Sequence, residues 1–269
     1  MNFVAPALAD LGTGPALFDR LAGMEGETYR LVKSRRTFRF EHGGSAYFAK
    51  VHFGVGWGEI FKNLVSLRLP ILGAGDELRA IRRLESLGVP TMEAVAFVQL
   101  GANPAARRSA IVTRELEDTI SLEDLVLQHD VTPLQRRRLV EAVASMTRRM
   151  HGGGLNHRDL YICHFHLHRD SLDERRPHLS VIDLHRAQIR GRTPRRWLVK
   201  DVAGLFFSTF DAGLSERDYL RFVRRYSGKP LGRALIEDAG FWRDVARRAC
   251  RLYRSEFGEV PTHIREMLA

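Results

Sequence analysis

Residues 155–168 read LNHRDLYICHFHLH and place an aspartate, Asp159, between histidines on both sides. The stretch follows directly on Gly152, Gly153 and Gly154, which are typical of the end of a helix. The residues before it, from Thr132 to about His151, have a capping residue, a proline in the first turn and apolar residues at helical spacing: Leu139, Val143, Met146 and Met150. We therefore expect a loop held by a long helix, and such loops often carry catalytic residues.

The histidines of this stretch permit two interpretations. His164, His166 and His168 alternate, so on a strand they would share one face, as a zinc site requires. A structural zinc site normally has four ligands, however, and the two cysteines of the chain form no CxxC pair. The other interpretation is phosphoryl transfer, in which Asp159 accepts the proton of an attacking hydroxyl group.

Further residues fit the phosphoryl-transfer interpretation. Asp183 follows the apolar residues 179–182 at the end of a predicted strand and would hold Mg²⁺ against the phosphates while Asp159 takes the proton. Lys50, in the mostly apolar AYFAKVH, would bind phosphate, and Glu77 would form an ion pair with it. The structural alternatives are two loop-capping carboxylates, a surface lysine on an edge strand and a solvated helix glutamate.

The chain divides into a sheet-rich front part and a helical back part. Strands are predicted for ETYRLVKS, TFRFE and AYFAKVH within 27–52, with a turn at 42–44, and again for MEAVAFVQL and SAIVTREL. Beyond residue 117 the periodicity is mainly helical, for example in DYLRFVRRY. We therefore predict an α+β fold with an N-terminal extension at 1–24, an N-terminal lobe with an antiparallel sheet and a helix at 25–116, and a mostly helical C-terminal lobe at 117–269.

One predicted helix has an apolar face whose role the sequence leaves open. Its residues follow helical spacing at Trp57, Ile60, Phe61, Leu64 and Val65, and apolar positions continue at Leu67, Leu69 and Ile71. The face either belongs to the core or contacts a membrane surface or lipid substrate, because Trp57 and Phe61 stand beside Lys62 and Arg68.

Several of these motifs together resemble a known family. Lys50 in FAKV, Glu77, NHRDLYICH and IDLH occur in the order found in the protein-kinase-like fold. More narrowly, GVGWGEIFKNL, NHRDLYICHF and SVIDLHRAQ resemble the lipopolysaccharide core heptose(I) kinase family of Gram-negative bacteria. The resemblance covers roughly residues 25–255. It implies a bilobal protein-kinase-like fold and an ATP-dependent kinase that phosphorylates the first heptose of the lipopolysaccharide inner core.

The resemblance also implies a role for each matching residue. Lys50 would bind the α and β phosphates of ATP, and Glu77 would hold Lys50. Asp159 would act as the base, and Asp183 would ligate Mg²⁺. Structural support for the catalytic loop would come from His157, Arg158 and Asp201, the last in WLVKDVAGL. Glu115, near the end of the N-terminal lobe, is placed with the nucleotide-binding residues.

The chain departs from the general kinase pattern at three points. No GxGxxG precedes Lys50, and the loop between the first two strands is instead Lys33-Ser34-Arg35-Arg36, so Arg35 and Arg36 would replace glycine amides at the phosphates. His164 stands five residues after Asp159, where asparagine is usual, and DLH replaces DFG. His164 is predicted either to ligate the metal or to pack and form hydrogen bonds.

Charge and composition indicate the partners. The net charge of +10 favours polyanions, and the predicted acceptor is the anionic lipid A–inner core glycolipid, held by a basic wall of Arg190, Arg192, Arg195 and Arg196. An acidic protein partner and peripheral contact with the inner membrane also fit this charge. Nucleic acid is not expected, because residues 190–200 interleave only one aromatic residue with their basic ones. The runner-up function is a kinase of the same fold acting on another small hydroxylated substrate or on protein.

The predicted location is the cytoplasm, with peripheral association at the cytoplasmic face of the inner membrane. No apolar run approaches the roughly 20 residues of a membrane span, and no basic leader precedes the apolar residues of MNFVAPALADLGTG. Two cysteines far apart in the sequence do not indicate a disulfide framework.

Overall fold

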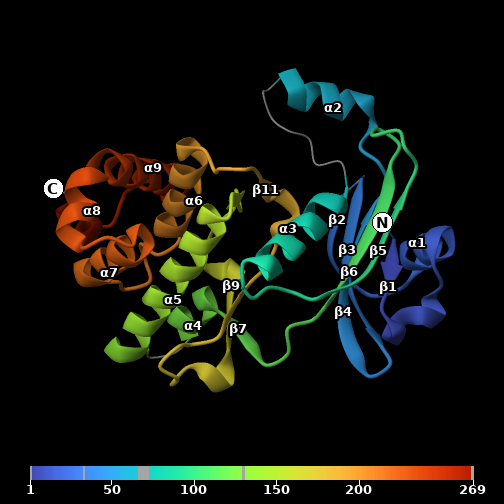
Figure 1. The fold of residues 1–269 in the computed structure, drawn as a ribbon, viewed down its shortest axis with the longest axis horizontal. Helices are drawn as coiled ribbons and strands as arrows, with labels where there is room; N and C mark the ends of the chain where they lie inside the picture. Colours follow the sequence, from blue (N-terminus) through green and yellow to red (C-terminus); the bar gives the residue numbers. More distant parts are fainter. Residues whose placement is uncertain (1, 33, 66–72, 129–130, 268–269) are drawn as a thin grey trace. The chain divides into compact units, whose positions relative to one another are not determined.

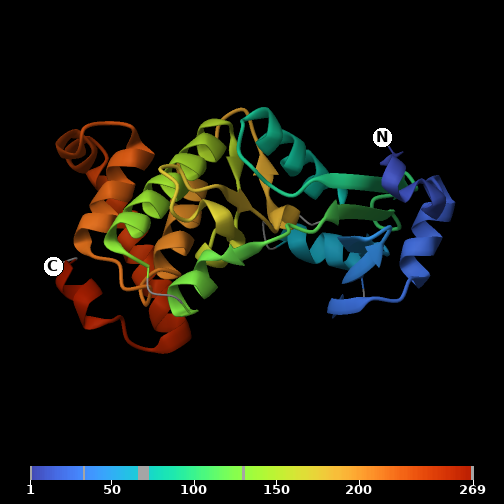
Figure 2. The ribbon, with the colours of Figure 1, turned by 90° about the horizontal axis from the view of Figure 1, so that it is seen from below.

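A computed structural model of the chain describes residues 2–32, 34–65, 73–128 and 131–267. They form two compact units, whose elements can be followed in Figures 1 and 2. The first unit comprises the residues up to Arg82, Met92–Leu116 and Leu184–Arg186, and the second comprises Arg83–Thr91, Glu117–Asp183 and the residues from Ala187 onward. The first unit is built on an antiparallel sheet and the second is mostly helical, which confirms the predicted α+β class and its division into a sheet-rich part and a helical part.

The sheet of the first unit has six strands in the order β1-β5-β6-β4-β3-β2, and every neighbouring pair is antiparallel. The β3–β4 hairpin turns through Gly43 and Gly44, which both have positive φ as a tight two-residue hairpin turn requires. The strands are β1 (Phe3–Val4), β2 (Glu27–Val32), β3 (Arg35–His42), β4 (Ser45–His52), β5 (Ala94–Leu100) and β6 (Arg108–Arg114).

The structure corrects the expected start of the second strand in the 27–52 region. β3 begins at Arg35 instead of Thr37, because the ladder continues along the whole of β4 and pairs Arg35 with His52 and Arg36 with Val51. The prediction that Arg35 and Arg36 lie in a loop is therefore wrong. Lys33 lies outside the described residues.

Side chains alternate along β4, so that one face of the strand packs into the core and the other face carries the predicted phosphate-binding lysine. Tyr47, Ala49 and Val51 are buried against the N-terminal elements η1 (Pro6–Leu11) and α1 (Gly14–Gly23). Because neighbouring strand residues point to opposite faces, Lys50 leaves the sheet on the other side. Residues of the predicted N-terminal extension thus belong to the main core of the unit. Without them, the apolar side chains of β4 on this face would be exposed to water.

Two helices follow β4, and they differ in burial. In α3 (Gly75–Ser86) the side chains of Leu78, Ile81 and Leu84 are buried. In α2 (Gly56–Val65) three apolar side chains stay in solvent, with exposed fractions of 52% for Trp57, 60% for Phe61 and 85% for Val65. The core interpretation of this apolar face is wrong for these three residues. The continuation at Leu67, Leu69 and Ile71 lies outside the described residues.

The second unit is built around α5 (Pro133–Gly152), whose N-terminus has the predicted cap. The Thr132 hydroxyl accepts from the backbone N–H of Gln135, and the Gln135 side chain accepts from the backbone N–H of Thr132. All four predicted inward residues of this helix are buried, as are Tyr219, Phe222 and Val223 of α7. The other helices are α4 (Leu122–Gln128), α6 (Arg195–Phe207), α7 (Glu216–Ser227), α8 (Leu231–Glu237), α9 (Ala239–Phe257) and α10 (Thr262–Met267).

Short strands carry the loops of the second unit. One antiparallel sheet has the order β10-β9-β7, and β11 pairs with β8. Their bounds are β7 (Thr119–Ser121), β8 (Leu155–Asn156), β9 (Phe165–His168), β10 (Leu179–Val181) and β11 (Gln188–Ile189). Among the helices of the described ranges, none combines the length and the apolar character needed to cross a bilayer.

Candidate active site

The end of α5 fixes where the aspartate loop begins. Gly154 has a φ of +79°, and a Cβ at this position would lie 1.9 Å from the carbonyl oxygen of Arg190. Only glycine therefore allows β11 to pass this close and to form the 2.9 Å hydrogen bond from the Arg190 N–H to the Gly154 carbonyl. The loop that follows starts from a fixed strand pair.

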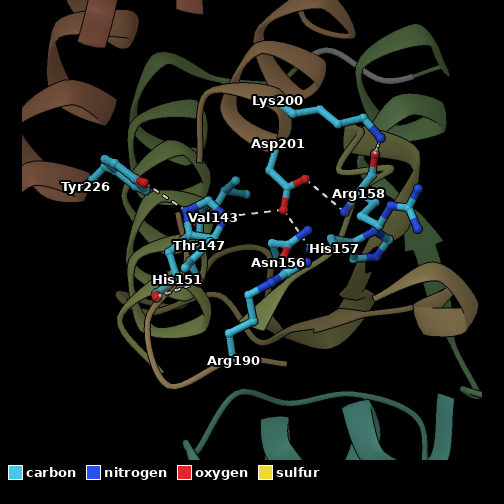
Figure 3. A network of polar contacts seen from close by, with 11 residues as sticks. Val143, Thr147, His151, Asn156, His157, Arg158, Arg190, Lys200, Asp201 and Tyr226 are labelled. Atoms are coloured by element: carbon cyan, nitrogen blue, oxygen red, sulfur yellow. Dashed lines mark hydrogen bonds and ion pairs between the residues drawn. The ribbon is translucent and has the colours of Figure 1, made fainter. Parts of the chain in front are cut away.

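Asp201 of α6 holds the loop backbone through its carboxylate, as the dashed lines in Figure 3 show. Its carboxylate is fully buried and accepts hydrogen bonds from the backbone N–H groups of His157 at 2.6 Å and Arg158 at 2.8 Å. His151 Nε2 lies 3.3 Å from the same carboxylate, and its Nδ1 lies 2.8 Å from the Tyr226 hydroxyl. Hydrogen bonds to a buried charge are strong, so they can hold Arg158 at its unusual φ of 78°.

Asp159 follows this strained residue with its carboxylate still accessible. Its side chain is 17% exposed, and Lys200 Nζ lies 3.8 Å from Oδ1. The same ammonium group donates a hydrogen bond to the Arg158 carbonyl. The loop therefore presents a carboxylate whose backbone and electrostatic partner are both fixed by α6.

Asp183 is brought to the same place by β10. The Ile182 N–H donates to the His164 carbonyl at 2.9 Å, and His157 Nε2 donates to the Ile182 carbonyl at 2.9 Å. Burial lowers the pKa of His157, which keeps its ring neutral for this bond. Asp183 has a φ of 61°, in the left-handed region that non-glycine residues rarely adopt. Like Arg158, it is therefore a strained backbone position at the candidate site.

The hydrogen bonds of His164 determine its tautomer. Nδ1 lies 2.7 Å from the Asp159 carbonyl, which can only accept, so Nδ1 carries the proton. In the neutral ring Nε2 then has the lone pair, and this atom lies 3.8 Å from Asp183 Oδ2. A histidine oriented in this way is ready to bind a cation together with a carboxylate.

The zinc interpretation of the alternating histidines finds no support. His166 bonds to Thr119 at 3.2 Å, and His168 bonds to Ser180 at 3.0 Å. His168 also stacks on His178 with 4.1 Å between ring centroids. Within the part of the chain that the structure describes, no three or more His, Cys, Asp or Glu side chains converge as a metal cluster.

In the first unit, Lys50 and Glu77 form the ion pair that the sequence predicts. Lys50 Nζ donates to Glu77 Oε1 at 2.6 Å, and the Glu77 side chain is only 1% exposed. A buried carboxylate of this kind holds the ammonium group in one place. Nearby, burial and then the charges of Arg35 and Lys50 lower the pKa of His52 to about 3.

Two other predicted nucleotide-binding residues have side chains that are engaged within the first unit. Arg36 donates to the Met24 carbonyl at 2.8 Å and lies over the Phe38 ring at 4.3 Å. Arg39 Nε donates to both Glu115 carboxylate oxygens, at 3.1 and 3.0 Å. Their roles toward a nucleotide stay predictions.

The four arginines predicted to form a basic wall separate into two groups. Arg190 and Arg196 lie over the Trp197 ring, whereas Arg195 forms a 2.6 Å ion pair with Asp244 of α9, and Arg192 is exposed. Sequence reasoning missed both Trp197 and Lys200 as site residues. Their proximity in sequence to Asp201, within WLVKDVAGL, was the available signal.

A cavity of about 350 Å³ lies within the second unit among α4, α5, α6 and α7. Its wall is mostly apolar and includes Leu139 and Phe222. None of Asp159, His164 and Asp183 lines it. The cavity is therefore separate from the carboxylates of the candidate site.

The class of protein follows from how the aspartates are held. A helix carboxylate that fixes the backbone of an aspartate loop, next to a second aspartate at a strand end, is the arrangement of the protein-kinase-like phosphotransferases. The ion pair between Lys50 of β4 and the buried Glu77 of α3 agrees with this class.

Comparison with known proteins narrows the class to a family. The model of the lipopolysaccharide kinase (Kdo/WaaP) family matches residues 19–226. The chain is 48% identical over 260 residues to the lipopolysaccharide core heptose(I) kinase WaaP of Pseudomonas aeruginosa PAO1, covering 93% of this chain and 96% of the relative. It is 48% identical over 232 residues to WaaP of Escherichia coli K12, covering 85% and 88%.

A solved structure gives the same result. WaaP in complex with acyl carrier protein has a TM-score of 0.81 and 42% sequence identity, covering 94% of this chain and 99% of that one. The chain belongs to the lipopolysaccharide kinase (Kdo/WaaP) family, which confirms the resemblance found in the sequence. It is accordingly a kinase, with ATP as the phosphoryl donor.

Replacing Asp201 by asparagine tests the support of the loop. The Asp201→Asn variant turns one acceptor into a donor that faces a backbone N–H, so we expect a loss of roughly 2–4 kcal/mol in the free energy of unfolding. The matched control is Asp244→Asn, which weakens only exposed ion pairs, those with Arg195 and Arg247, and should cost less than about 1 kcal/mol. Urea denaturation measures both, and equal losses would contradict the assigned role of Asp201.

Proposed function

We propose that this kinase transfers the γ-phosphoryl group of ATP to a hydroxyl group of the first heptose of the lipopolysaccharide inner core. The observation that carries the proposal is the fixed loop on which Asp159 stands beside His164 and Asp183. The relatives named as core heptose(I) kinases, which are 46–48% identical over most of the chain, support the choice of acceptor.

Asp159 acts as the general base. Its accessible carboxylate accepts the proton of the acceptor hydroxyl, and the Asp201 bonds to the preceding residues keep it in place. Lys200 Nζ lies 3.8 Å from Oδ1 of this carboxylate, and the attraction between the two groups helps to fix the position of the side chain. Precise positioning of such a base matters because phosphoryl transfer depends mainly on geometry and charge stabilisation.

Asp183 and His164 are the residues that would hold the Mg²⁺ that accompanies ATP. The carboxylate of Asp183 is the type of oxygen ligand that Mg²⁺ prefers, and the unprotonated Nε2 of His164 faces it. When bound, the ion would neutralise charge on the β and γ phosphates. His164 thus takes the position that asparagine has in most kinases, and its nitrogen also suits Mn²⁺.

Lys50 binds the α and β phosphates, and Glu77 keeps its ammonium group in position. The pair is almost closed to water, with side-chain exposures of 14% and 1%. A lysine that already has one buried anion as a partner is oriented before the nucleotide arrives, so less conformational entropy is lost on binding.

Substitution of Asp159, Lys50 and Asp183 tests the mechanism. Asp159→Ala should retain ATP binding and reduce turnover about 10²- to 10⁴-fold, the usual effect of removing a positioned base. Lys50→Ala and Asp183→Ala should instead weaken the binding of Mg-ATP, and excess Mg-ATP should restore the activity of these variants only in part. Steady-state kinetics with ATP and truncated core glycolipid measure both effects, with the exposed Asp170→Ala as the control. Normal turnover of Asp159→Ala would exclude Asp159 as the base.

An acidic protein partner accompanies this function. The solved relative bound to acyl carrier protein supports such a partner for this chain. The outer face of α9 offers four exposed arginines at helical spacing: Arg243, Arg247, Arg251 and Arg254. Of these, only Arg247 has a described carboxylate neighbour, Asp244 at 3.6 Å. The row therefore suits an acidic helix.

Charge reversal on α9 tests the partner surface. Arg247→Glu with Arg251→Glu should weaken binding of purified acyl carrier protein at least about tenfold, because like charges then meet across the contact. The control reverses Arg217 and Arg224 on α7, which are exposed as well. Titration calorimetry at two salt concentrations separates the variants. The same loss in both would indicate attraction by net charge alone.

The enzyme also meets the membrane that carries its acceptor. Trp57 and Phe61 lie one turn apart on α2 with 5.9 Å between ring centroids, and both are exposed. Aromatic side chains on an exposed helix, next to an exposed lysine, Lys62, suit the interface of an anionic bilayer. Peripheral association through α2 is thus part of the proposal.

Removal of these rings tests the membrane contact. Trp57→Ser with Phe61→Ser should lower binding to vesicles that contain anionic phospholipid at least about tenfold, because two aromatic side chains no longer leave water. Leu235→Ser with Ile236→Ser removes exposed apolar side chains of α8 and serves as the control. Vesicle co-sedimentation measures the binding. Unchanged binding of the α2 variant would exclude α2 as the contact.

A further inference from the structure

Four cationic side chains gather around one indole ring, that of Trp197 in the first turn of α6. The distances to the ring centroid are 5.3 Å for Arg196, 5.5 Å for Arg158, 5.6 Å for Arg190 and 5.9 Å for Lys200. The cations come from the aspartate loop, from the end of β11 and from α6 itself. The fold thus collects positive charge from three segments at one point.

This charge is only partly balanced. The Arg190 guanidinium donates to two neutral amide oxygens, those of Asn156 at 2.6 Å and Gln188. Burial and then the charge of Arg196 lower the pKa of Arg190, so the two guanidinium groups lie close enough to repel. Within the described ranges, neither has an ion pair with a carboxylate. Attraction to the ring, about 0.5–1 kcal/mol at exposed sites, does not remove this repulsion, whereas a bound anion would.

The neighbouring arginines show that this arrangement is selective. Arg195 pairs with Asp244, and Arg192 is exposed with no described partner. Four arginines within seven residues thus have different surroundings, and only two of them converge on Trp197. A generally basic surface would not require such convergence.

Lys200 connects the group to the chemistry. Its Nζ is 5.9 Å from the Trp197 centroid and 3.8 Å from Asp159 Oδ1, and Figure 3 shows it reaching over the Arg158 carbonyl. An anion held by the guanidinium groups would therefore lie beside the hydroxyl group that Asp159 deprotonates. Guanidinium groups bind carboxylates and phosphates through paired hydrogen bonds, which would also orient the acceptor.

We propose that Arg190, Arg196 and Lys200 form an anion subsite around Trp197, which binds one carboxylate or phosphate group of the acceptor next to the reacting hydroxyl group. The inference rests on the proposed function, because it assumes an acidic acceptor. A sugar carboxylate close to the heptose and a phosphate of the lipid part have the same chemistry, and the experiment separates them.

The first experiment compares two double variants with the same change in net charge. Arg190→Gln with Arg196→Gln should raise the KM for the glycolipid at least about tenfold and leave the KM for ATP within about twofold. The control, Arg192→Gln with Arg195→Gln, should change neither KM by more than about twofold. Equal effects of the two double variants, or no effect of the first, would overturn the subsite.

Arg190 also bonds to Asn156, so the double variant must be checked for folding. The single variant Arg196→Gln removes only an exposed side chain and should still raise the KM for the glycolipid. An unchanged KM in this variant, with the double variant unfolded, would count against the proposal.

Modified acceptors identify the anion. One glycolipid has its sugar carboxyl groups reduced to alcohols, and another lacks the lipid phosphates. The KM increase of the double variant should disappear for the acceptor that lacks the bound group and persist for the other. If the increase persists for both acceptors, the subsite binds neither group and the proposal is wrong.

A binding measurement separates failure of the subsite from failure of the proposed function. The indole N–H signal of Trp197, assigned from Trp197→Phe, should shift saturably when inorganic phosphate is added to the wild-type protein, and the shift should be lost in Arg190→Gln with Arg196→Gln. A shift without phosphorylation of any heptose glycolipid would retain the subsite and reject the proposed function. Phosphorylation of the glycolipid, with no shift of the Trp197 signal and no change in the KM of the double variant, would retain the proposed function and reject the subsite.

Discussion

Hydrogen bonds from two consecutive backbone N–H groups to the Asp201 carboxylate determine the geometry of the candidate active site. A carboxylate with no exposure to water requires compensation, and the amides of His157 and Arg158 supply it. The dependence is mutual, because the same bonds hold Arg158 in a backbone conformation that is rare for a residue with a side chain. Asp159, the proposed base, therefore follows a backbone segment whose conformation is fixed by these bonds.

Rigid elements supply most of the remaining order. β10 delivers Asp183, β4 delivers Lys50, and α3 delivers Glu77, so each charged group starts from a helix or strand with a packed opposite face. The hydrogen bonds of His164 and His157 then tie the two aspartate segments of the second unit together. A few side chains thus carry the chemistry, and the helices and strands around them restrict the motion of these side chains.

Periodicity in the sequence predicted the elements well and the side-chain directions poorly. The β4 strand and the capped α5 helix follow from local rules of alternation and capping, whereas the Lys50–Glu77 pair follows from the phosphoryl-transfer pattern. The exposure of the apolar face of α2 could not be predicted in this way, because helical spacing is the same for a face that packs into the core and for a face that contacts another molecule. The arginines of 190–196 are chemically identical in the sequence, and only the tertiary contacts of Trp197 and Asp244 separate them.

The order of the strands has a consequence for synthesis on the ribosome. Buried side chains of η1 and α1 are made before β4, β5 and β6, against which they pack. The ladder between β4 and β6 is complete only when Arg114 of β6 is present to face Tyr47. More than a third of the chain is therefore synthesised after these apolar N-terminal side chains before the last of their partner strands is complete. The nascent first unit should be a stronger client of ribosome-associated chaperones than the second, whose helices form from local contacts.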